Sequence, residues 1–181
     1  ATHAYNKANK TVKLVRRSLF FFKPDIIIIV DEMEKYQNKS TMQVRFHPFN
    51  LDDKAELSAG SEGEFIISRP SANLYGKLFS PDEIILRNDK LDIPFEEINF
   101  KSNIGIRKQV FPFIEGSVKK SSKKLQIISV LSSQKKSIDL LPKLQITKNV
   151  NKYLIEIEKH DGKFIFDLRT DKKYPYIHKY V

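Results

Sequence analysis

Apolar and polar residues alternate along most segments of this chain that are rich in β-branched and aromatic residues. Between Thr41 and His47, for example, Met42, Val44 and Phe46 alternate with polar residues. Successive side chains of a β-strand point to opposite sides, so a period of two predicts a strand with one buried face. No long segment repeats apolar residues at the helical period of 3.6, and we therefore expect the chain to fold from strands.

A β-hairpin is predicted near the C-terminus. Residues 153–158 and 163–168 both alternate, and His160-Asp161-Gly162 lies between them. Glycine adopts the positive φ angles that a tight turn between two strands requires. The two alternating segments should therefore pair as neighbouring antiparallel strands.

Further segments are predicted to be strands because they are rich in β-branched and aromatic residues and are separated by proline and glycine. These segments are Thr11–Lys23, Ile26–Lys35, Glu64–Ser68, Glu83–Arg87, Ile104–Phe113, Leu125–Ser132 and Leu144–Thr147. Asn50–Leu57 is expected to form one short helical turn behind an Asn or Asp cap. Many short strands separated by turns favour an all-β fold, specifically an antiparallel two-sheet β-sandwich.

The sandwich is assigned to residues 1–170, and residues 171–181 are assigned to a basic, aromatic C-terminal tail. A chain of 181 residues is long enough for one domain of ordinary size and too short for two large ones. Alternation predicts that a set of apolar residues is mostly buried: Val12, Leu14, Ile27, Ile29, Val44, Phe46, Ile127, Ile155, Phe164 and Phe166.

Several classes of function are excluded by what the chain lacks. Without cysteine it has no disulfide, no thiol nucleophile and no cysteine-bound metal cluster. Its glycines form neither a G-x-G-x-x-G motif nor a phosphate loop, so no nucleotide cofactor is implied. The longest strongly apolar run, Ile26–Val30, is far shorter than the ~20 residues of a membrane span. The chain begins at Ala1 without an initiator Met, and we interpret it as part of a longer protein.

The net charge of +10 predicts attraction to polyanions. The excess is concentrated in residues 101–124, where Glu115 is the single acidic residue. A solvated loop within that segment is expected to bind acidic polysaccharide weakly and by charge only, through Lys119, Lys120, Lys123 and Lys124. Specific nucleic-acid binding is not expected, because lysine-rich loops without interleaved exposed aromatic residues give salt-sensitive, non-specific attraction.

His47 is the histidine that the pattern singles out. Alternation places it on the polar face of its strand together with Arg45, at the strand end and directly before Pro48. Strand ends often line binding sites, whereas an exposed histidine at such a position is also common without any function. The four histidines, at positions 3, 47, 160 and 178, do not have the short spacing of a metal-binding motif.

The N-terminal quarter of the chain carries a characteristic order of residues. Tyr5 is followed by Arg16-Arg17, Lys23-Pro24-Asp25, Val30-Asp31 and Phe46-His47. This order resembles the heparinase II/III-like family of bacterial polysaccharide lyases, in which an α/α-toroid precedes a C-terminal β-sandwich. The resemblance covers residues 4–47 and agrees with the all-β fold expected from alternation.

The resemblance implies a part in the β-elimination of uronic-acid-containing polysaccharides such as glycosaminoglycans. The toroid supplies most of the catalytic residues in that family, so the chain by itself is expected to be inactive and to hold no cofactor. Tyr5 corresponds to a catalytic tyrosine facing the domain interface. His47 corresponds to one ligand of a structural divalent metal, zinc, whose other ligands would lie before Ala1. A periplasmic or secreted location follows from the resemblance alone.

A non-catalytic carbohydrate-binding or scaffold domain is the alternative interpretation. In such a domain, exposed aromatic residues such as Tyr75 and Phe79 would stack against sugar rings. The expected partner in both cases is an acidic polysaccharide, and the lyase interpretation adds the upstream toroid of the same protein.

Overall fold

The computed structural model describes residues 10–37, 41–93, 109–118, 122–138, 140–150, 152–171 and 174–180, and in this part of the chain all regular structure is β. The strands are β1 (Val12–Phe22), β2 (Ile26–Lys35), β3 (Gln43–Phe46), β4 (Glu56–Ala59), β5 (Glu64–Ser68), β6 (Ala72–Phe79), β7 (Ile84–Ile93), β8 (Gln109–Val118), β9 (Lys124–Lys135), β10 (Lys143–Lys148), β11 (Lys152–Lys159), β12 (Gly162–Arg169) and β13 (Tyr176–Tyr180). None of the described residues belongs to a helix that could span a lipid bilayer.

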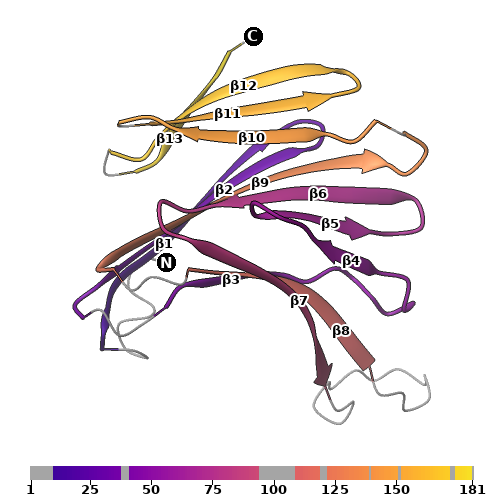
Figure 1. The fold of residues 1–181 in the computed structure, drawn as a ribbon, viewed down its shortest axis with the longest axis horizontal. Helices are drawn as coiled ribbons and strands as arrows, with labels where there is room; N and C mark the ends of the chain where they lie inside the picture. Colours follow the sequence, from indigo (N-terminus) through magenta and orange to yellow (C-terminus); the bar gives the residue numbers. More distant parts are fainter. Residues whose placement is uncertain are drawn as a thin grey trace.

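The strands form three antiparallel sheets stacked as layers (Figure 1). Sheet A has the order β1-β2-β9-β6-β5-β4 and lies in the middle. Sheet B (β3-β8-β7) covers one face of sheet A, and sheet C (β10-β11-β12-β13) covers the other. The predicted all-β antiparallel sandwich is confirmed, with three sheets in place of the two expected.

Sheet A is buried on both faces because its central strands are apolar on both faces. In β2, Ile28 and Val30 point toward sheet C, while Ile29 and Met33 point toward sheet B. The core between sheets A and B also includes Val44, Phe65, Leu78, Ile114 and Ile127, and the core between sheets A and C includes Tyr75, Ile128, Ile155, Phe166 and Leu168. Strands buried on both sides are expected to read as continuous apolar runs rather than as alternation.

The predicted hairpin is present as β11 and β12. Their register pairs Lys159 with Gly162 across the turn, and Gly162 has a φ of 143°.

Of the ten apolar residues predicted to be buried, six are buried, and Leu14, Ile27, Phe46 and Phe164 are half-buried. Local alternation therefore identified these faces correctly.

The prediction of a helical turn at Asn50–Leu57 is wrong. Asn50 and Asp53 form a turn instead, in which Asp53 N–H donates to the Asn50 carbonyl and Asp53 has a φ of 52°. A left-handed residue ends any right-handed helix at that point. The Asn50 side chain accepts a hydrogen bond from Ala55 N–H at 2.8 Å, and the chain then continues directly into β4.

Other strand boundaries differ from the predicted ones. β7 extends to Ile93 beyond the predicted end at Arg87, and β8 runs to Val118 beyond Phe113. The predicted start of that strand at Ile104 lies outside the described residues. β4 and β6 were not predicted, and the segment assigned to the C-terminal tail contributes β13, which pairs with β12.

Candidate functional site

A surface groove with a volume of about 400 Å³ opens beside His47. It lies between the segment that follows β3 and the turn that joins β5 to β6. Its polar lining comprises Arg45, His47, Arg69, Asn73 and Ser133, and its apolar lining comprises Phe46, Pro48, Phe49, Ile67, Ala72 and Leu74. We call these residues the His47 groove.

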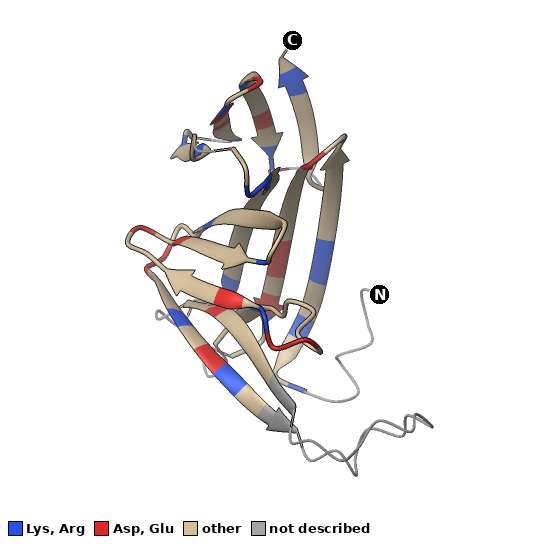
Figure 2. Ribbon diagram, turned by 90° about the vertical axis from the view of Figure 1, so that its right-hand side faces the viewer, with Lys and Arg blue, Asp and Glu red and all other residues tan. Residues whose placement is uncertain are grey.

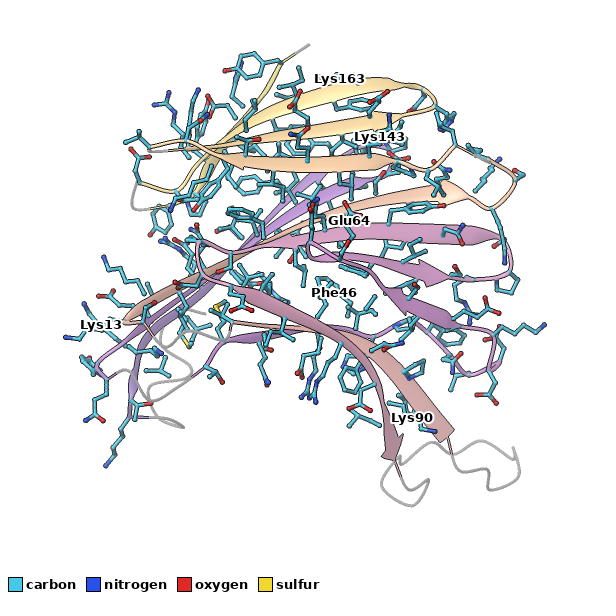
Figure 3. All side chains as sticks on the ribbon, in the orientation of Figure 1. Lys13, Phe46, Glu64, Lys90, Lys143 and Lys163 are labelled. Atoms are coloured by element: carbon cyan, nitrogen blue, oxygen red, sulfur yellow. The ribbon has the colours of Figure 1, made fainter. Side chains whose placement is uncertain are left out.

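The fold brings the groove together from three separate parts of the chain. β3 ends at Phe46, so the chain leaves sheet B at His47. β6 pairs with β9, and this register places Leu74 opposite Ser133 at the rim of sheet A. Phe46 lies between sheets A and B (Figure 3). Its ring stacks on Phe65 of β5, with ring centroids 5.4 Å apart. This packing fixes the distance between the end of β3 and the β5–β6 turn.

Arg45 is held in place by a buried carboxylate. Glu115 of β8 is 1% exposed and lies opposite Arg45 in the β3–β8 register. Arg45 Nε donates to Glu115 Oε2 at 2.5 Å, while Arg87 Nε donates to Oε1 at 2.8 Å. Gln43 Nε2 donates to the same Oε1 at 3.3 Å. Arg87 also lies 3.9 Å from Asp89, so the two guanidinium groups are balanced by two carboxylates.

Opposing effects act on the ionisation of Glu115. Burial by itself raises the pKa of the carboxyl, but hydrogen bonds from Arg87 and Arg45 hold the pKa below its ordinary value of 4.5. The carboxylate is therefore charged at neutral pH and keeps Arg45 oriented.

The ring of Phe113 on β8 contacts Arg45 and His47, two of the residues that line the groove. The Arg45 guanidinium carbon lies 4.9 Å from the centroid of the Phe113 ring. The His47 ring centroid lies 5.2 Å from the same ring, and the two planes are inclined by 40°. Contacts of a cation and an imidazole with one aromatic ring restrict their rotamers. His47 itself is exposed to solvent.

The lining of the groove also includes two buried polar atoms that form no hydrogen bond with any described residue. Arg69 Nη2 donates to Asp52 Oδ2 at 2.7 Å, and its guanidinium carbon lies 6.0 Å from the Phe49 ring centroid. Arg69 Nη1 and Asn73 Oδ1 are buried and have no hydrogen-bond partner among the described residues. Buried polar atoms are normally hydrogen-bonded, so these two atoms are exceptions among the described residues.

Figure 2 shows that Lys and Arg elsewhere in the fold often lie beside Asp and Glu of neighbouring strands. On β1 and β2, for example, Arg17 pairs with Asp31 at 2.7 Å and Lys13 with Glu34 at 2.9 Å. Figure 3 shows Lys13, Lys90 and Lys163 at well-separated edges of the molecule. Net positive charge alone therefore does not locate a binding surface among the described residues.

The structure places the predicted site residues as follows. His47 lines the groove, whereas Tyr5, Lys119 and Lys120 lie outside the described residues. Lys123 and Lys124 are exposed where the chain enters β9. Ser133 of the groove is nine residues further along the same strand, which corresponds to about 30 Å at ~3.3 Å per residue. Lys123 and Lys124 are thus on a different surface from the His47 groove.

The described residues do not assemble a metal site around His47. Within that part of the chain, no three histidine or carboxylate side chains are close enough to bind one metal ion. The zinc site inferred from the resemblance therefore stays a prediction that involves residues outside the described part.

Of the two aromatic residues named for the alternative sugar-binding face, one is buried and the other is half-buried. Tyr75 is 6% exposed and belongs to the core between sheets A and C. Phe79 packs edge-on against Tyr153 in the same core, with centroids 5.6 Å apart. They do not form an exposed aromatic face for a sugar ring, because sheet C covers this face of sheet A.

Arg69 and Asn73 were not predicted as site residues. Arg69 precedes Pro70 between two strands, a sequence that indicates only a turn. Neither residue has a local signal that distinguishes it from other polar residues in turns. Their role in the groove depends on the position of β3, which lies more than twenty residues earlier in the chain.

Comparison with known proteins identified solved structures with the same fold. A heparinase III is 20% identical, with a TM-score of 0.61 over 97% of this chain and 25% of that chain. A heparan sulfate lyase, HepC from Pedobacter heparinus, is 11% identical, with a TM-score of 0.65 over 92% of this chain and 25% of that chain. No protein-family model and no curated protein matched.

This chain spans about a quarter of the length of the solved structures that it matches. At these sequence identities the similarity establishes the fold. The resemblance seen in residues 4–47 is therefore confirmed at the level of the fold. The chain folds as a β-sandwich similar to the quarter of each lyase structure that it matches.

Proposed function

We propose that this chain is the β-sandwich domain of a heparinase II/III-like polysaccharide lyase and that the His47 groove binds the acidic polysaccharide. The fold shared with heparinase III and with a heparan sulfate lyase is the observation that carries the proposal. The catalytic reaction of the whole protein would be β-elimination at a uronic acid.

The chemistry of the groove supports a polyanionic ligand. Arg45 and Arg69 both line the groove, and His47, which directly follows β3, lines it as well. A guanidinium group recognises carboxylate and sulfate groups through paired N–H donors. The Phe49 ring and the floor of the groove provide apolar surface for the C–H face of a sugar ring.

On this proposal the isolated chain is inactive, because catalysis requires the upstream toroid as well as the β-sandwich. The groove contains cationic and imidazole groups but no described tyrosine, and Tyr5 is proposed to take the catalytic position at the interface with an upstream toroid. An exposed apolar pair on the edge strand β1, Leu19 and Phe21, is 59% and 53% exposed and would suit contact with another domain. We propose a periplasmic or secreted location, which fractionation of the source cells tests.

Binding of heparan sulfate oligosaccharides to the chain tests the groove. Arg69→Gln should lower the affinity about tenfold at physiological salt, because one charged hydrogen-bonding group is lost. Lys143→Gln is the matched control, since Lys143 is 76% exposed on sheet C and its loss changes the net charge equally. Equal losses in the two variants would show that binding depends on net charge and would contradict the proposed site.

Lyase activity tests the wider proposal. The isolated chain should form no unsaturated product from heparan sulfate, as followed by its ultraviolet absorbance. The full-length protein should form it, and Tyr5→Phe or His47→Ala should reduce the rate there. Binding without cleavage by the full-length protein would instead identify a non-catalytic carbohydrate-binding domain.

A further inference from the structure

A second cavity lies on the outer face of sheet C, with a volume of about 520 Å³. It is lined by Asp167 and Arg169 of β12 and by Tyr176, His178 and Tyr180 of β13. The register explains the grouping, because Arg169 pairs with Tyr176 and Asp167 pairs with His178, so that these side chains share one face of the sheet. We call these five residues the β13 site.

The β13 site is remote from the His47 groove. Sheet A and sheet C both lie between the two, since the groove is on the sheet B side of sheet A and the β13 site is on the outer face of sheet C. Packed sheets are ~10 Å apart, so the two sites are separated by about 20 Å or more. A single sugar unit bound in one therefore does not contact the residues of the other.

Aromatic side chains cover much of the β13 site without being buried. Tyr176 is 56% exposed and Tyr180 is 47% exposed, on a strand at the edge of its sheet. The His178 ring packs edge-on against Tyr180, with centroids 5.1 Å apart and planes inclined by 85°. Exposed rings held in fixed orientations at a concave surface are suited to stacking on the C–H face of a pyranose ring.

The polar groups of the site are built around a buried carboxylate. Asp167 is 5% exposed, and its Oδ2 accepts hydrogen bonds from Lys152 Nζ at 2.8 Å and from the Tyr180 hydroxyl at 3.2 Å. Its Oδ1 is buried and has no hydrogen-bond partner among the described residues. The two hydrogen bonds to Oδ2 hold Lys152 and the Tyr180 hydroxyl at the site.

The charge of the site favours an anionic ligand. The hydrogen bond from Lys152 holds the pKa of Asp167 below its usual range, with further contributions from the Tyr180 hydroxyl and the charge of Arg169. Lys152 balances the Asp167 carboxylate, which leaves the exposed guanidinium of Arg169 in excess. Guanidinium groups pair with carboxylate and sulfate oxygens.

We propose that the β13 site binds an acidic sugar unit of a polysaccharide, with its ring against Tyr176 and Tyr180 and its anionic group paired with Arg169. Asp167 positions the Tyr180 ring and Lys152 from beneath. The site holds the polymer at a second point and takes no part in cleavage. This inference does not depend on the His47 groove, because it rests on residues of sheet C alone.

Imidazole NMR signals give each site its own reporter. His178 belongs to the β13 site, His47 to the groove, and His160 lies in the β11–β12 turn as an internal reference. Titration with a short heparin-derived oligosaccharide at physiological salt should shift the signals of His178, and a neutral maltooligosaccharide should not. Equal shifts with the neutral sugar would overturn the assignment to acidic sugars.

Two substitutions and their controls complete the test. Tyr176→Ala and Arg169→Gln should each raise the dissociation constant read from His178 about tenfold, since each removes one main contact. Tyr36→Ala, which removes a 59% exposed aromatic ring of similar exposure, and Lys143→Gln should leave it unchanged. If the oligosaccharide shifts His47 but not His178, the β13 site is wrong and the proposed function stands. If it shifts only His178, the β13 site stands and the groove proposal fails.

Discussion

Lys159 Nζ is fully buried and donates a hydrogen bond to Asp25 Oδ2, which connects sheet C to the turn between β1 and β2 of sheet A. The two residues are 134 positions apart. Asp161 lies near the same ammonium group, at 3.7 Å. The Asp25 carbonyl also accepts a hydrogen bond from Ser133 N–H at 3.1 Å. Asp25 therefore connects the β1–β2 turn to β9 through its backbone carbonyl and to sheet C through its side chain.

Removing one partner of this pair should destabilise the protein strongly. Asp25→Ala leaves the buried ammonium of Lys159 without its nearest carboxylate, and we expect a loss of about 3 kcal/mol in the free energy of unfolding. Urea denaturation measures this loss. Glu158→Ala is the control, because its ion pair with Lys143 is exposed and should contribute less than about 1 kcal/mol. Similar losses in the two variants would mean that the buried pair does not stabilise the packing of sheet C.

Glu115 should make the stability of the fold depend on acidity. Its pKa is lower in the folded state than its ordinary value of 4.5, so the unfolded chain binds the proton more readily. The stabilisation is present above pH 4.5 and is lost as the pH falls through the folded-state pKa. In urea titrations over that acidic range, Glu115→Gln should show a weaker decline in unfolding free energy than the unsubstituted protein. An unchanged decline would assign the acid sensitivity to other carboxyl groups.

Gly76 should not tolerate a side chain. A Cβ at this position would lie 2.1 Å from Cζ of Phe65, the ring that packs between sheets A and B and stacks on Phe46. Gly76→Ala should therefore lower the free energy of unfolding by about 2 kcal/mol, the usual cost of overpacking a core. Gly60→Ala is the matched control, since its Cβ would come no nearer than 3.4 Å to another atom. A similar melting temperature for both variants would show that the Phe65 ring moves aside at little cost.

The lysine loop should attract polyanions by charge alone. Replacing Lys119, Lys120, Lys123 and Lys124 by Gln should lower the salt concentration at which the chain elutes from heparin, and should leave its melting temperature unchanged. Charges are screened over about 8 Å at physiological salt, so clustered lysines act together and dispersed ones do not. A control that replaces Lys90, Lys136, Lys143 and Lys148, which are exposed at separate places, should elute nearer to the unsubstituted chain. An earlier melting transition in the first variant would instead show that its lysines are structural.

Strand formation in this protein is a local property, and it could be predicted well. The alternation of Met42, Val44 and Phe46 is sufficient to identify the buried face of β3, because backbone pleating sets that face whatever the rest of the fold does. The β11–β12 hairpin follows for the same reason, with Gly162 supplying the turn. β6 was harder to recognise, because Gly76 interrupts its pattern where Phe65 needs the space.

The number of layers was the less predictable part of the fold. The run Ile26–Val30 lacks alternation, and such a run is typical of a strand covered on both faces. It therefore contained a sign of the third sheet. Which strands cover each face depends on contacts between distant segments, such as Ile29 with the core of sheet B and Ile28 with that of sheet C.

By itself, the sequence determined the strands, most of their buried faces and His47 as a polar residue at a strand end. Only the tertiary structure decided what surrounds His47. Arg69, Asn73 and Ser133 reach the groove because the β3–β8 and β6–β9 registers bring three chain segments to one rim, and no local pattern records such a register. The β13 site arises in the same way, since Asp167 meets Tyr180 only when β12 and β13 pair. Side-chain periodicity is a short-range property, whereas a binding site consists of neighbours that the folded backbone brings together.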